Sequence, residues 1–276
     1  MGTVGVVTGA GRGMGLDCAR RLTGMVDTLV LVDLDEATVK AAAQELSSAD
    51  AAVVEHHVLD ITDADGVQRL ADRVAGLGTL RAVAHVAGIS PTMADWRRIF
   101  TVDLVATARL AEAFRPLATA GTAWVYFASM APAIGGVQID AATAEILDRP
   151  LDPSFLDRIR ESFGPTIEHP GAAYAVAKLG VKRYAQQEAV RLGPLGGRVN
   201  SVSPGLIDTP QGRQEAADNP RIAEWIGTTP VGRLGQAAEL ASVVAFALSD
   251  EASFLSGTDL LVDGGLCAAV RGPGSH

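Results

Sequence analysis

The 276-residue chain is acidic, with a formal net charge of −9, and 48% of its residues are hydrophobic. It has no basic block to attract nucleic acid or anionic membranes, its longest apolar runs fall short of a membrane span, and its two cysteines cannot form a disulfide framework. The first predicted strand begins so near the amino terminus that no signal peptide is expected, so we expect a single cytoplasmic domain over residues 1–276, without a metal site.

The first segment of the chain has the pattern of a dinucleotide-binding strand–turn–helix unit. A buried strand around Val6 leads into the glycine-rich turn Thr8–Gly15, and the following helix ends near Gly24. A helix start has unpaired backbone N–H groups and a partial positive charge, so it can bind a phosphate. Glycines in such a turn remove the Cβ atoms that would hold a pyrophosphate away from these amides. The glycines concerned are Gly9, Gly13 and Gly15.

An acidic residue, Asp33, follows the second predicted strand, Asp27–Val32. It lies about 20 residues after Gly13, where a carboxylate would meet the adenosine ribose. This carboxylate can accept hydrogen bonds from both ribose hydroxyls and would repel a 2′-phosphate, which favours NAD over NADP. Arg12 has the opposite effect because it could pair with that phosphate, but no further Arg or Lys follows until Lys40.

Strand-like and helix-like segments alternate along most of the chain. Repeated strand–helix units with short links imply right-handed crossovers and a parallel sheet. The sequence therefore predicts an α/β, doubly wound Rossmann-type domain with a seven-stranded, mostly parallel sheet and helices on both faces. The later strands are predicted at 52–58, 81–86, 123–128, 198–202 and 259–262, the helices at 36–46, 63–75, 96–117, 171–192 and 237–248, and a long loop at 204–235.

The alternation stops after the fifth strand, between about residues 134 and 170. Two proline-flanked segments there, Ala141–Leu147 and Ser154–Phe163, have the pattern of short helices. We expect this helical insert to bury an apolar side and to shape the substrate entrance. The alternative is a solvent-exposed lid. The apolar residues of the insert are Ile139, Ile146, Leu147, Phe155, Leu156, Ile159 and Phe163.

Three side chains could form one catalytic unit. Tyr174 and Lys178 stand four residues apart and share a helix face, whereas Ser129 ends a strand at the sheet edge where ligands gather. A nearby ammonium stabilises a phenolate and lowers its pKa, so such a tyrosine could accept the proton of an alcohol. The alternative is an unrelated surface pair.

From Thr3 to Gly265 the chain resembles the short-chain dehydrogenase/reductase family. The resemblance is carried by T-G-A-G-R-G-M-G (Thr8–Gly15), Asp60-Ile61, Y-A-V-A-K (Tyr174–Lys178), N-S-V-S-P-G-L-I-D-T (Asn200–Thr209) and V-D-G-G (Val262–Gly265). It implies that Tyr174 is the acid/base, that Ser129 donates to the substrate oxygen, and that Lys178 holds the nicotinamide ribose. The cofactor contacts that it implies are Gly9, Arg12, Gly13, Met14, Gly15, Asp33, Asp60, Ile61, Ala87, Gly88, Tyr174, Lys178, Pro204, Gly205, Ile207 and Thr209.

The chain departs from the family pattern in three ways. His85 stands in the usually Asn-rich turn before Ala87-Gly88, and we interpret it as a packed, hydrogen-bonded substitute. Asp103 replaces the Asn that normally completes a catalytic tetrad. Ser129 and Tyr174 are 45 residues apart, where the family commonly has about a dozen. The extra segment is similar in place and size to that of bacterial 3α-hydroxysteroid dehydrogenase/carbonyl reductase-like members. It could cover the two helices through which many members dimerise, so we expect a dimer or tetramer that uses another surface.

The predicted function is an NAD-dependent oxidoreductase that interconverts a secondary alcohol and a ketone. The substrate is a small molecule. The resemblance to the bacterial 3α-hydroxysteroid dehydrogenase/carbonyl reductase-like members implies a hydroxysteroid or another bulky apolar alcohol, and the 204–235 loop favours the same class because it carries Leu206, Ile222, Trp225 and Ile226. The alternatives are a catalytically impaired nucleotide-binding regulator and an epimerase or dehydratase on the same fold.

Overall fold

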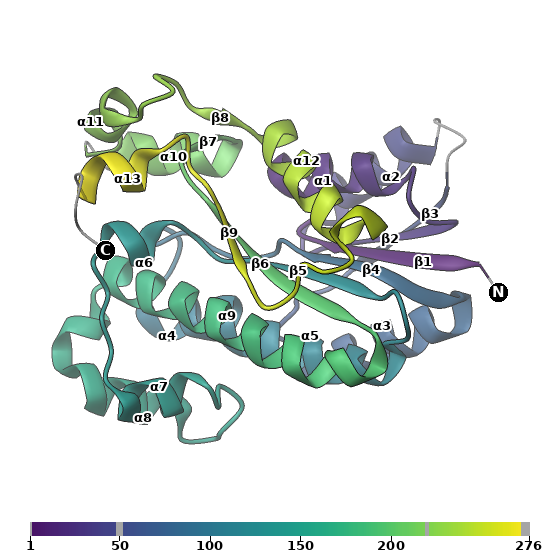
Figure 1. Ribbon diagram of the computed structural model, residues 1–276, viewed down its shortest axis with the longest axis horizontal. Helices are drawn as coiled ribbons and strands as arrows, with labels where there is room; N and C mark the ends of the chain where they lie inside the picture. Colours follow the sequence, from purple (N-terminus) through teal and green to yellow (C-terminus); the bar gives the residue numbers. More distant parts are fainter. Residues whose placement is uncertain (1, 48–51, 219–220, 272–276) are drawn as a thin grey trace.

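The computed structural model describes residues 2–47, 52–218 and 221–271, and it has the predicted α/β architecture (Figure 1). One seven-stranded sheet has the order β3-β2-β1-β4-β5-β6-β9, and all of its neighbouring strands are parallel. The order reverses between β1 and β4, which creates a crevice at the carboxyl ends of these strands. The strands are β1 (Thr3–Thr8), β2 (Thr28–Asp33), β3 (Val53–Val58), β4 (Thr79–His85), β5 (Ala123–Phe127), β6 (Arg198–Pro204) and β9 (Asp259–Val262).

Helices cover both faces of the sheet and bury two apolar cores. On one face lie α1 (Gly13–Leu22), α2 (Glu36–Ser47) and α12 (Ala237–Leu248), as the upper part of Figure 1 shows. The opposite core contains the large side chains Phe100, Phe114, Trp124 and Tyr126. Central strands are near-continuous apolar runs because both faces are covered. The helices on that second face are α3 (Ala64–Leu77), α4 (Trp96–Phe100), α5 (Ala106–Phe114) and α9 (Pro170–Leu192).

The single helix predicted at 96–117 is interrupted, so that expectation was wrong in detail. A π-helical turn, Thr101–Val105, separates α4 from α5, and a 3₁₀ turn, Arg115–Leu117, ends the segment. The Thr107 hydroxyl donates to the Asp103 carbonyl oxygen, a side-chain bond that competes with regular helix pairing. Such π-turns widen the helix locally and often occur at functional sites.

The insert packs against the second face, with α7 (Ala141–Leu147) and α8 (Phe155–Phe163) at the predicted positions. Its apolar side is buried as expected: Phe155 meets Phe100 edge to face, with ring centroids 5.7 Å apart. Arg183 on α9 donates two hydrogen bonds, of 2.8 and 2.7 Å, to Asp148. The insert therefore covers part of the face formed by α4 and α9, in the lower part of Figure 1.

The region predicted as a long loop at 204–235 is largely structured, which corrects the sequence expectation. The Thr209 hydroxyl accepts a hydrogen bond of 3.0 Å from the Gly212 N–H, and Pro210 follows at the first helical position, so a helix starts there. The elements are β7 (Ile207–Asp208), α10 (Pro210–Asp218), α11 (Arg221–Thr228) and β8 (Gly235–Gln236), and α6 (Ala131–Ile134) and α13 (Leu266–Arg271) are further short helices.

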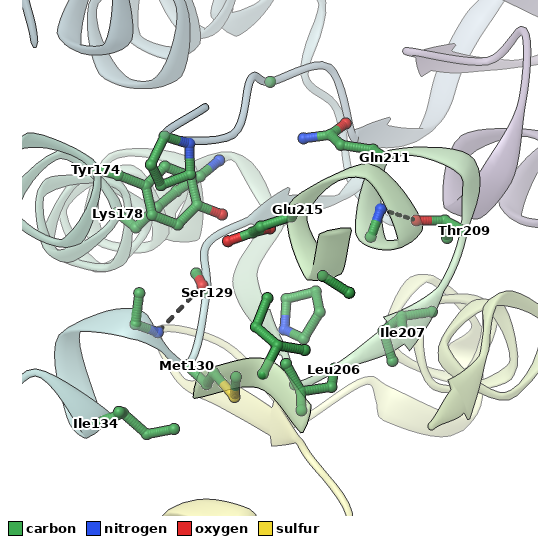
Figure 2. A pocket seen from close by; sticks show the side chains of 18 of the residues that line it. Ser129, Met130, Ile134, Tyr174, Lys178, Leu206, Ile207, Thr209, Gln211 and Glu215 are labelled. Atoms are coloured by element: carbon green, nitrogen blue, oxygen red, sulfur yellow. Dashed lines mark hydrogen bonds between the residues drawn. The ribbon is translucent and has the colours of Figure 1, made fainter. Parts of the chain in front are cut away.

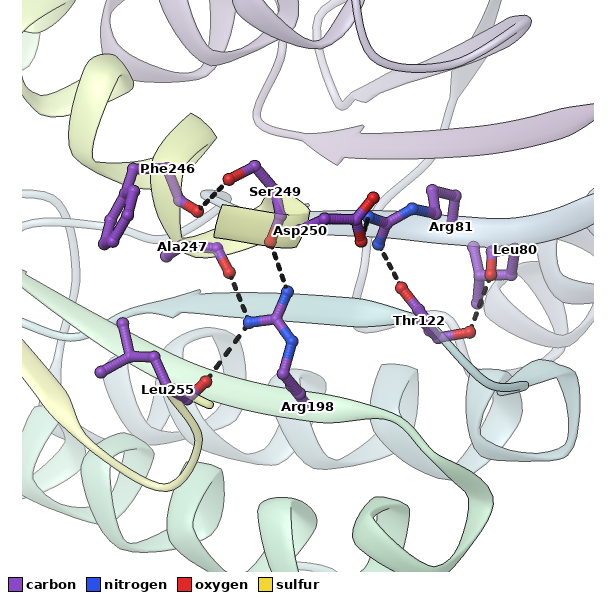
Figure 3. A network of polar contacts seen from close by, with 10 residues as sticks. Leu80, Arg81, Thr122, Arg198, Phe246, Ala247, Ser249, Asp250 and Leu255 are labelled. Carbon is purple, nitrogen blue, oxygen red and sulfur yellow. Dashed lines mark hydrogen bonds and ion pairs between the residues drawn. The ribbon is translucent and has the colours of Figure 1, made fainter. Parts of the chain in front are cut away.

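At the opposite end of the sheet, Arg198 holds the carboxyl end of α12 in place (Figure 3). Its guanidinium donates to the carbonyl oxygens of Ala247, Ser249 and Leu255 at 2.9, 2.8 and 3.3 Å. These bonds satisfy carbonyls that a helix end leaves unpaired. Among the helices that the structure describes, none combines the length and apolar character needed to cross a bilayer.

Candidate active site

The carboxyl ends of β5 and β6 and the first turns of α9 surround a cavity of about 490 Å³. Ser129, Tyr174 and Lys178 all line it, so the structure brings together the three residues that the sequence singled out. Figure 2 shows the Ser129 and Tyr174 hydroxyls on the same side of the cavity. The Ser129 oxygen also accepts a hydrogen bond of 3.1 Å from the Ala131 N–H, which fixes its position at the start of α6.

Lys178 lies buried beneath the tyrosine. Its Nζ donates to the Phe127 carbonyl oxygen at 3.0 Å, lies 3.4 Å from Asp103 Oδ1, and is 5.6 Å from the centroid of the Tyr174 ring. These contacts point its ammonium group toward the end of β5 and the π-turn.

The expectation that the lysine lowers the tyrosine's pKa is not met in this structure. Burial raises the pKa of Tyr174, and the negative charge of Asp103 raises it further, whereas the hydrogen bond with Ser129 lowers it in part. The ammonium of Lys178 faces the Asp103 carboxylate, which opposes its effect on the phenol. The charge of Asp103 therefore bears directly on the pKa of Tyr174.

Asp103 reaches the site because the π-turn directs it inward. Its Oδ1 accepts a hydrogen bond of 3.0 Å from the Ile89 N–H, whereas Oδ2 is buried and has no partner among the described residues. Burial raises the pKa of Asp103, and Lys178 counteracts this in part. A Cβ at Gly88 would lie 2.7 Å from Asp103 Oδ1 and 3.1 Å from Lys178 Nζ, so this ion pair requires a glycine there.

His85 is the packed substitute that the sequence predicted. Its two ring nitrogens lie 2.7 Å from the Thr8 hydroxyl and 3.0 Å from the Thr107 hydroxyl. Burial lowers the pKa of His85 to about 3, with a contribution from Lys178, so the ring is neutral at physiological pH. It is a structural link between β4, β1 and α5.

A second cavity, of about 300 Å³, adjoins the first above the glycine turn, and the two share lining residues such as Met14 and Thr209. A Cβ at Gly15 would lie 1.9 Å from the Gly9 carbonyl oxygen, so the tight turn that exposes the start of α1 requires glycine. Room for a pyrophosphate at a helix start beside an acidic residue fits a nicotinamide dinucleotide. The expected residues that line this cavity are Gly9, Arg12, Gly13, Met14, Gly15, Asp33, Asp60, Ile61, Ala87, Gly88 and Thr209.

The two carboxylates of this second cavity are fixed differently. Asp33 Oδ2 accepts a hydrogen bond of 2.9 Å from the Gly11 N–H, and this bond holds the carboxylate beside the glycine turn. Asp60 is engaged by the Thr62 N–H and hydroxyl and by Arg98 at 3.0 Å. Asp60 is therefore less free to meet an adenine than the sequence implied. Arg98, which also lines the cavity, was missed because only the fold brings it there.

The substrate side of the first cavity is partly as predicted. Of the residues expected on the substrate loop, Leu206, Ile222 and Trp225 line it, but Ile226 does not. Pro204, Gly205 and Ile207, which were expected as cofactor contacts, line this cavity and not the second one. No residue of 136–170 lines the first cavity; only the base of the insert does, at Ile134, Gly135 and Gly171. The insert therefore meets the cavity only at its base, whereas its helices pack on α4 and α9. Its role in shaping the substrate entrance stays a prediction. Gln211 and Glu215, which sequence reasoning missed, enter the cavity from α10.

Comparison with known proteins identifies the family. The model of the family described as "short chain dehydrogenase" matches residues 3–138, and that described as "Enoyl-(Acyl carrier protein) reductase" matches residues 163–267. Short-chain dehydrogenase/reductase bsc3 of Alternaria brassicicola is 32% identical over 95% of both chains. The chain belongs to the short-chain dehydrogenase/reductase family. It is thus an oxidoreductase of the kind that acts on alcohols and ketones, and its family binds a nicotinamide cofactor.

Two further relatives are named for cyclic substrates. Cis-4-hydroxycyclohexanecarboxylate dehydrogenase of Sinomonas cyclohexanicum is 32% identical over 96% of both chains. The 3-alpha-(or 20-beta)-hydroxysteroid dehydrogenase of Mycobacterium tuberculosis is 28% identical over 98% of this chain and 91% of its own.

Two solved structures share the fold. A short-chain type dehydrogenase/reductase from Mycobacterium ulcerans has a TM-score of 0.77 at 26% identity, covering 96% of this chain and 90% of its own. A putative NAD(P) dependent gluconate 5-dehydrogenase from Beutenbergia cavernae, with bound NADP, has a TM-score of 0.75 at 25% identity, covering 96% and 97%.

Proposed function

We propose that this protein interconverts a secondary alcohol and its ketone with NAD, and that Tyr174 is the acid/base. The observation that carries the proposal is the pair of adjoining cavities: one holds Ser129, Tyr174 and Lys178, and the other holds the glycine turn and Asp33. The bound cofactor would supply the hydride acceptor or donor. The protein's own residues would bind the substrate oxygen and move its proton.

In oxidation, the substrate hydroxyl lies between the Ser129 and Tyr174 oxygens. Ser129 donates a hydrogen bond to that oxygen, and the ionised Tyr174 takes its proton as the carbon–oxygen double bond forms. In reduction, the Tyr174 hydroxyl returns the proton to the developing alkoxide. Lys178 is buried one turn away and would hold the nicotinamide ribose, with Phe127 and Asp103 fixing its ammonium.

NAD is proposed over NADP because of Asp33. Its carboxylate can accept from the ribose hydroxyls, and its charge repels a 2′-phosphate. The Beutenbergia structure contains NADP at low occupancy, so the fold alone does not exclude NADP and the proposal rests on the side chain at this position. We expect kcat/KM to be higher with NAD; a higher value with NADP would overturn the assignment.

The proposed substrate is a bulky, largely apolar alcohol, such as a hydroxysteroid. The cavity walls include the apolar side chains Met130, Ile134, Leu206, Ile222 and Trp225, and pockets for such ligands are mostly apolar with a few polar groups. Two relatives are named for ring alcohols, which agrees with this class.

A substrate screen tests the proposed function. Hydroxysteroids, cyclic alcohols and simple ketones are assayed with NAD(H) and NADP(H) by nicotinamide absorbance. Oxidation of ring alcohols with NAD is the expected result. Tight NAD binding without turnover of any alcohol or ketone would contradict the proposal and favour a nucleotide-binding regulator.

Two further parts of the proposal concern the whole protein. The chain is proposed to form a homo-oligomer, a dimer or tetramer, through a surface other than the one that the insert covers. A cytoplasmic location remains a prediction from the composition.

A further inference from the structure

The catalytic cavity contains a carboxylate that the reaction described above does not use. Glu215 lies on α10, one helical turn after Gln211, so the two side chains share a face of that helix. Both line the cavity, and Figure 2 shows the Glu215 carboxylate directed toward the Tyr174 and Ser129 hydroxyls. Its negative charge contributes to the raised pKa of Tyr174, as expected for a nearby group.

No group of the protein is seen to satisfy this carboxylate. Within residues 2–47, 52–218 and 221–271, no hydrogen-bond donor and no cation pairs with Glu215. Arg213, on the same helix, pairs instead with Asp208. The Glu215 side chain is half-buried, and this burial raises the pKa of Glu215.

The surroundings of Glu215 are only partly polar. The cavity is lined by the apolar side chains Ile134, Leu206, Ile222 and Trp225, and also by Gln211 and Arg221. A polar group in such a place destabilises the protein unless it is hydrogen-bonded, and a carboxylate accepts strong bonds from hydroxyl and ammonium donors. A ligand that brings such a donor would therefore gain more here than in water, and a ligand carboxylate would be repelled.

We propose that Glu215 determines substrate specificity by accepting a hydrogen bond from a second donor group, a hydroxyl or an ammonium, beside the reacting carbinol. The inference rests on the proposed alcohol–ketone activity and narrows its substrate class. The ligand is an alcohol with an apolar body and a vicinal donor. Enzymes that hydrogen-bond one substrate group reject analogues lacking it, because the buried partner is then left unpaired.

The test compares three matched ring alcohols: trans-cyclohexane-1,2-diol, trans-2-aminocyclohexanol and cyclohexanol, each assayed with NAD by nicotinamide absorbance. The readout is the ratio of kcat/KM for each donor-bearing alcohol to that for cyclohexanol. Any effect of the Glu215 charge on Tyr174 acts on all three substrates alike, so the ratio isolates the contact. The diol and the amino alcohol distinguish a hydroxyl donor from an ammonium donor.

The wild-type protein is expected to prefer at least one donor-bearing alcohol by about 10-fold or more. Glu215→Leu should bring both ratios to within about 3-fold of one. Glu215→Gln should keep part of a preference for the diol and lose a preference for the amino alcohol, because it retains an acceptor without the charge. Gln214→Leu, an exposed change on the same helix, is the matched control and should leave the ratios unchanged.

Equal kcat/KM values for the three alcohols in the wild type, or ratios that survive Glu215→Leu, would overturn the inference while leaving the alcohol–ketone activity in place. If none of these alcohols, nor any hydroxysteroid, were oxidised, the proposed function would fail and the inference with it.

Discussion

At the scale of single residues, the acid–base chemistry depends on the charges around one phenol. In the proposed mechanism, oxidation requires the ionised Tyr174, and burial and Asp103 both raise the pKa of this residue. The chain places an aspartate where the family usually has an asparagine, so its pH dependence should differ from the family's in a predictable direction.

Asp103→Asn should move the rising limb of the oxidation pH profile to lower pH, by about 0.5 to 1 unit. The substitution removes a negative charge that raises the pKa of Tyr174 but retains an oxygen that can accept from the Ile89 N–H. The measurement is kcat/KM for oxidation against pH in both proteins. An unchanged rising limb of the pH profile would show that Asp103 does not affect the ionisation of Tyr174.

His85 should make the fold sensitive to acid. Its pKa is lowered to about 3 in the folded protein, whereas an unfolded histidine titrates near 6.5, so the unfolded state binds an extra proton between these values. The contribution of His85 to stability is therefore complete above pH ~6.5 and is lost as pH falls below it.

Between pH 7.5 and 5.5, this effect should lower the free energy of unfolding by about 1 kcal/mol. His85→Asn should remove that component, leaving the pH dependence due to the other histidines. Urea unfolding of both proteins at the two pH values measures it. An equal pH dependence in wild type and variant would show that His85 is already charged or exposed.

At the scale of elements, the insert is a packed part of the second core. Phe155 is buried, and its ring meets Phe100 on α4. Phe155→Ala should lower the free energy of unfolding by about 3 to 4 kcal/mol, because it leaves a cavity between the insert and α4.

Urea denaturation followed by tryptophan fluorescence measures this loss. Phe254→Ala, at a fully exposed phenylalanine, is the control and should change stability by less than about 0.5 kcal/mol. NAD affinity should be retained in both variants, since neither residue lines either of the two cavities described above. Equal losses in the two variants would mean that the insert does not pack as described.

The individual elements show which parts of the fold could be predicted from the sequence. The seven strands were located to within a few residues. The central ones are continuous apolar runs because both faces of the sheet are covered, whereas β3 has the sequence VVEHHV and is largely exposed. The π-turn at Thr101–Val105 has no periodic signal in the sequence. Helix α10 is short and polar, and its Thr209-Pro210 start was the one usable signal.

Site residues that belong to sequence motifs could be predicted, whereas properties that depend on the three-dimensional arrangement could not. Ser129, Tyr174 and Lys178 were found from spacing and resemblance, and the structure brings them together. The sign of the Tyr174 pKa shift was missed because it depends first on how deeply the fold buries the phenol and then on the nearby charge of Asp103. Glu215 was missed because helix α10 was not expected.

At the scale of the whole molecule, the insert covers part of the face formed by α4 and α9, which limits the surfaces through which subunits could associate. Large apolar side chains are exposed elsewhere, among them Phe246 on α12 and Leu261 on the edge strand β9. Contiguous apolar patches favour association, and we propose that these two side chains belong to such a patch. The protein should therefore sediment as a dimer or tetramer, and Phe246→Arg should lower its mass.

Val190→Arg provides the comparison, because it introduces the same charge at an exposed residue of α9. It should leave the mass unchanged in sedimentation velocity. A variant pair with the opposite behaviour, in which Val190→Arg dissociates the oligomer and Phe246→Arg does not, would show that α9 still forms the interface.

The central claim is that Tyr174 transfers the substrate proton in a site built beside an NAD-binding turn. Tyr174→Phe tests it most directly, because this change removes one hydroxyl and leaves the glycine turn, Asp33 and Lys178 in place. The account predicts that kcat/KM for alcohol oxidation falls by at least about 100-fold, while the Kd for NAD stays within a few-fold of wild type. Activity within a few-fold of wild type would contradict it.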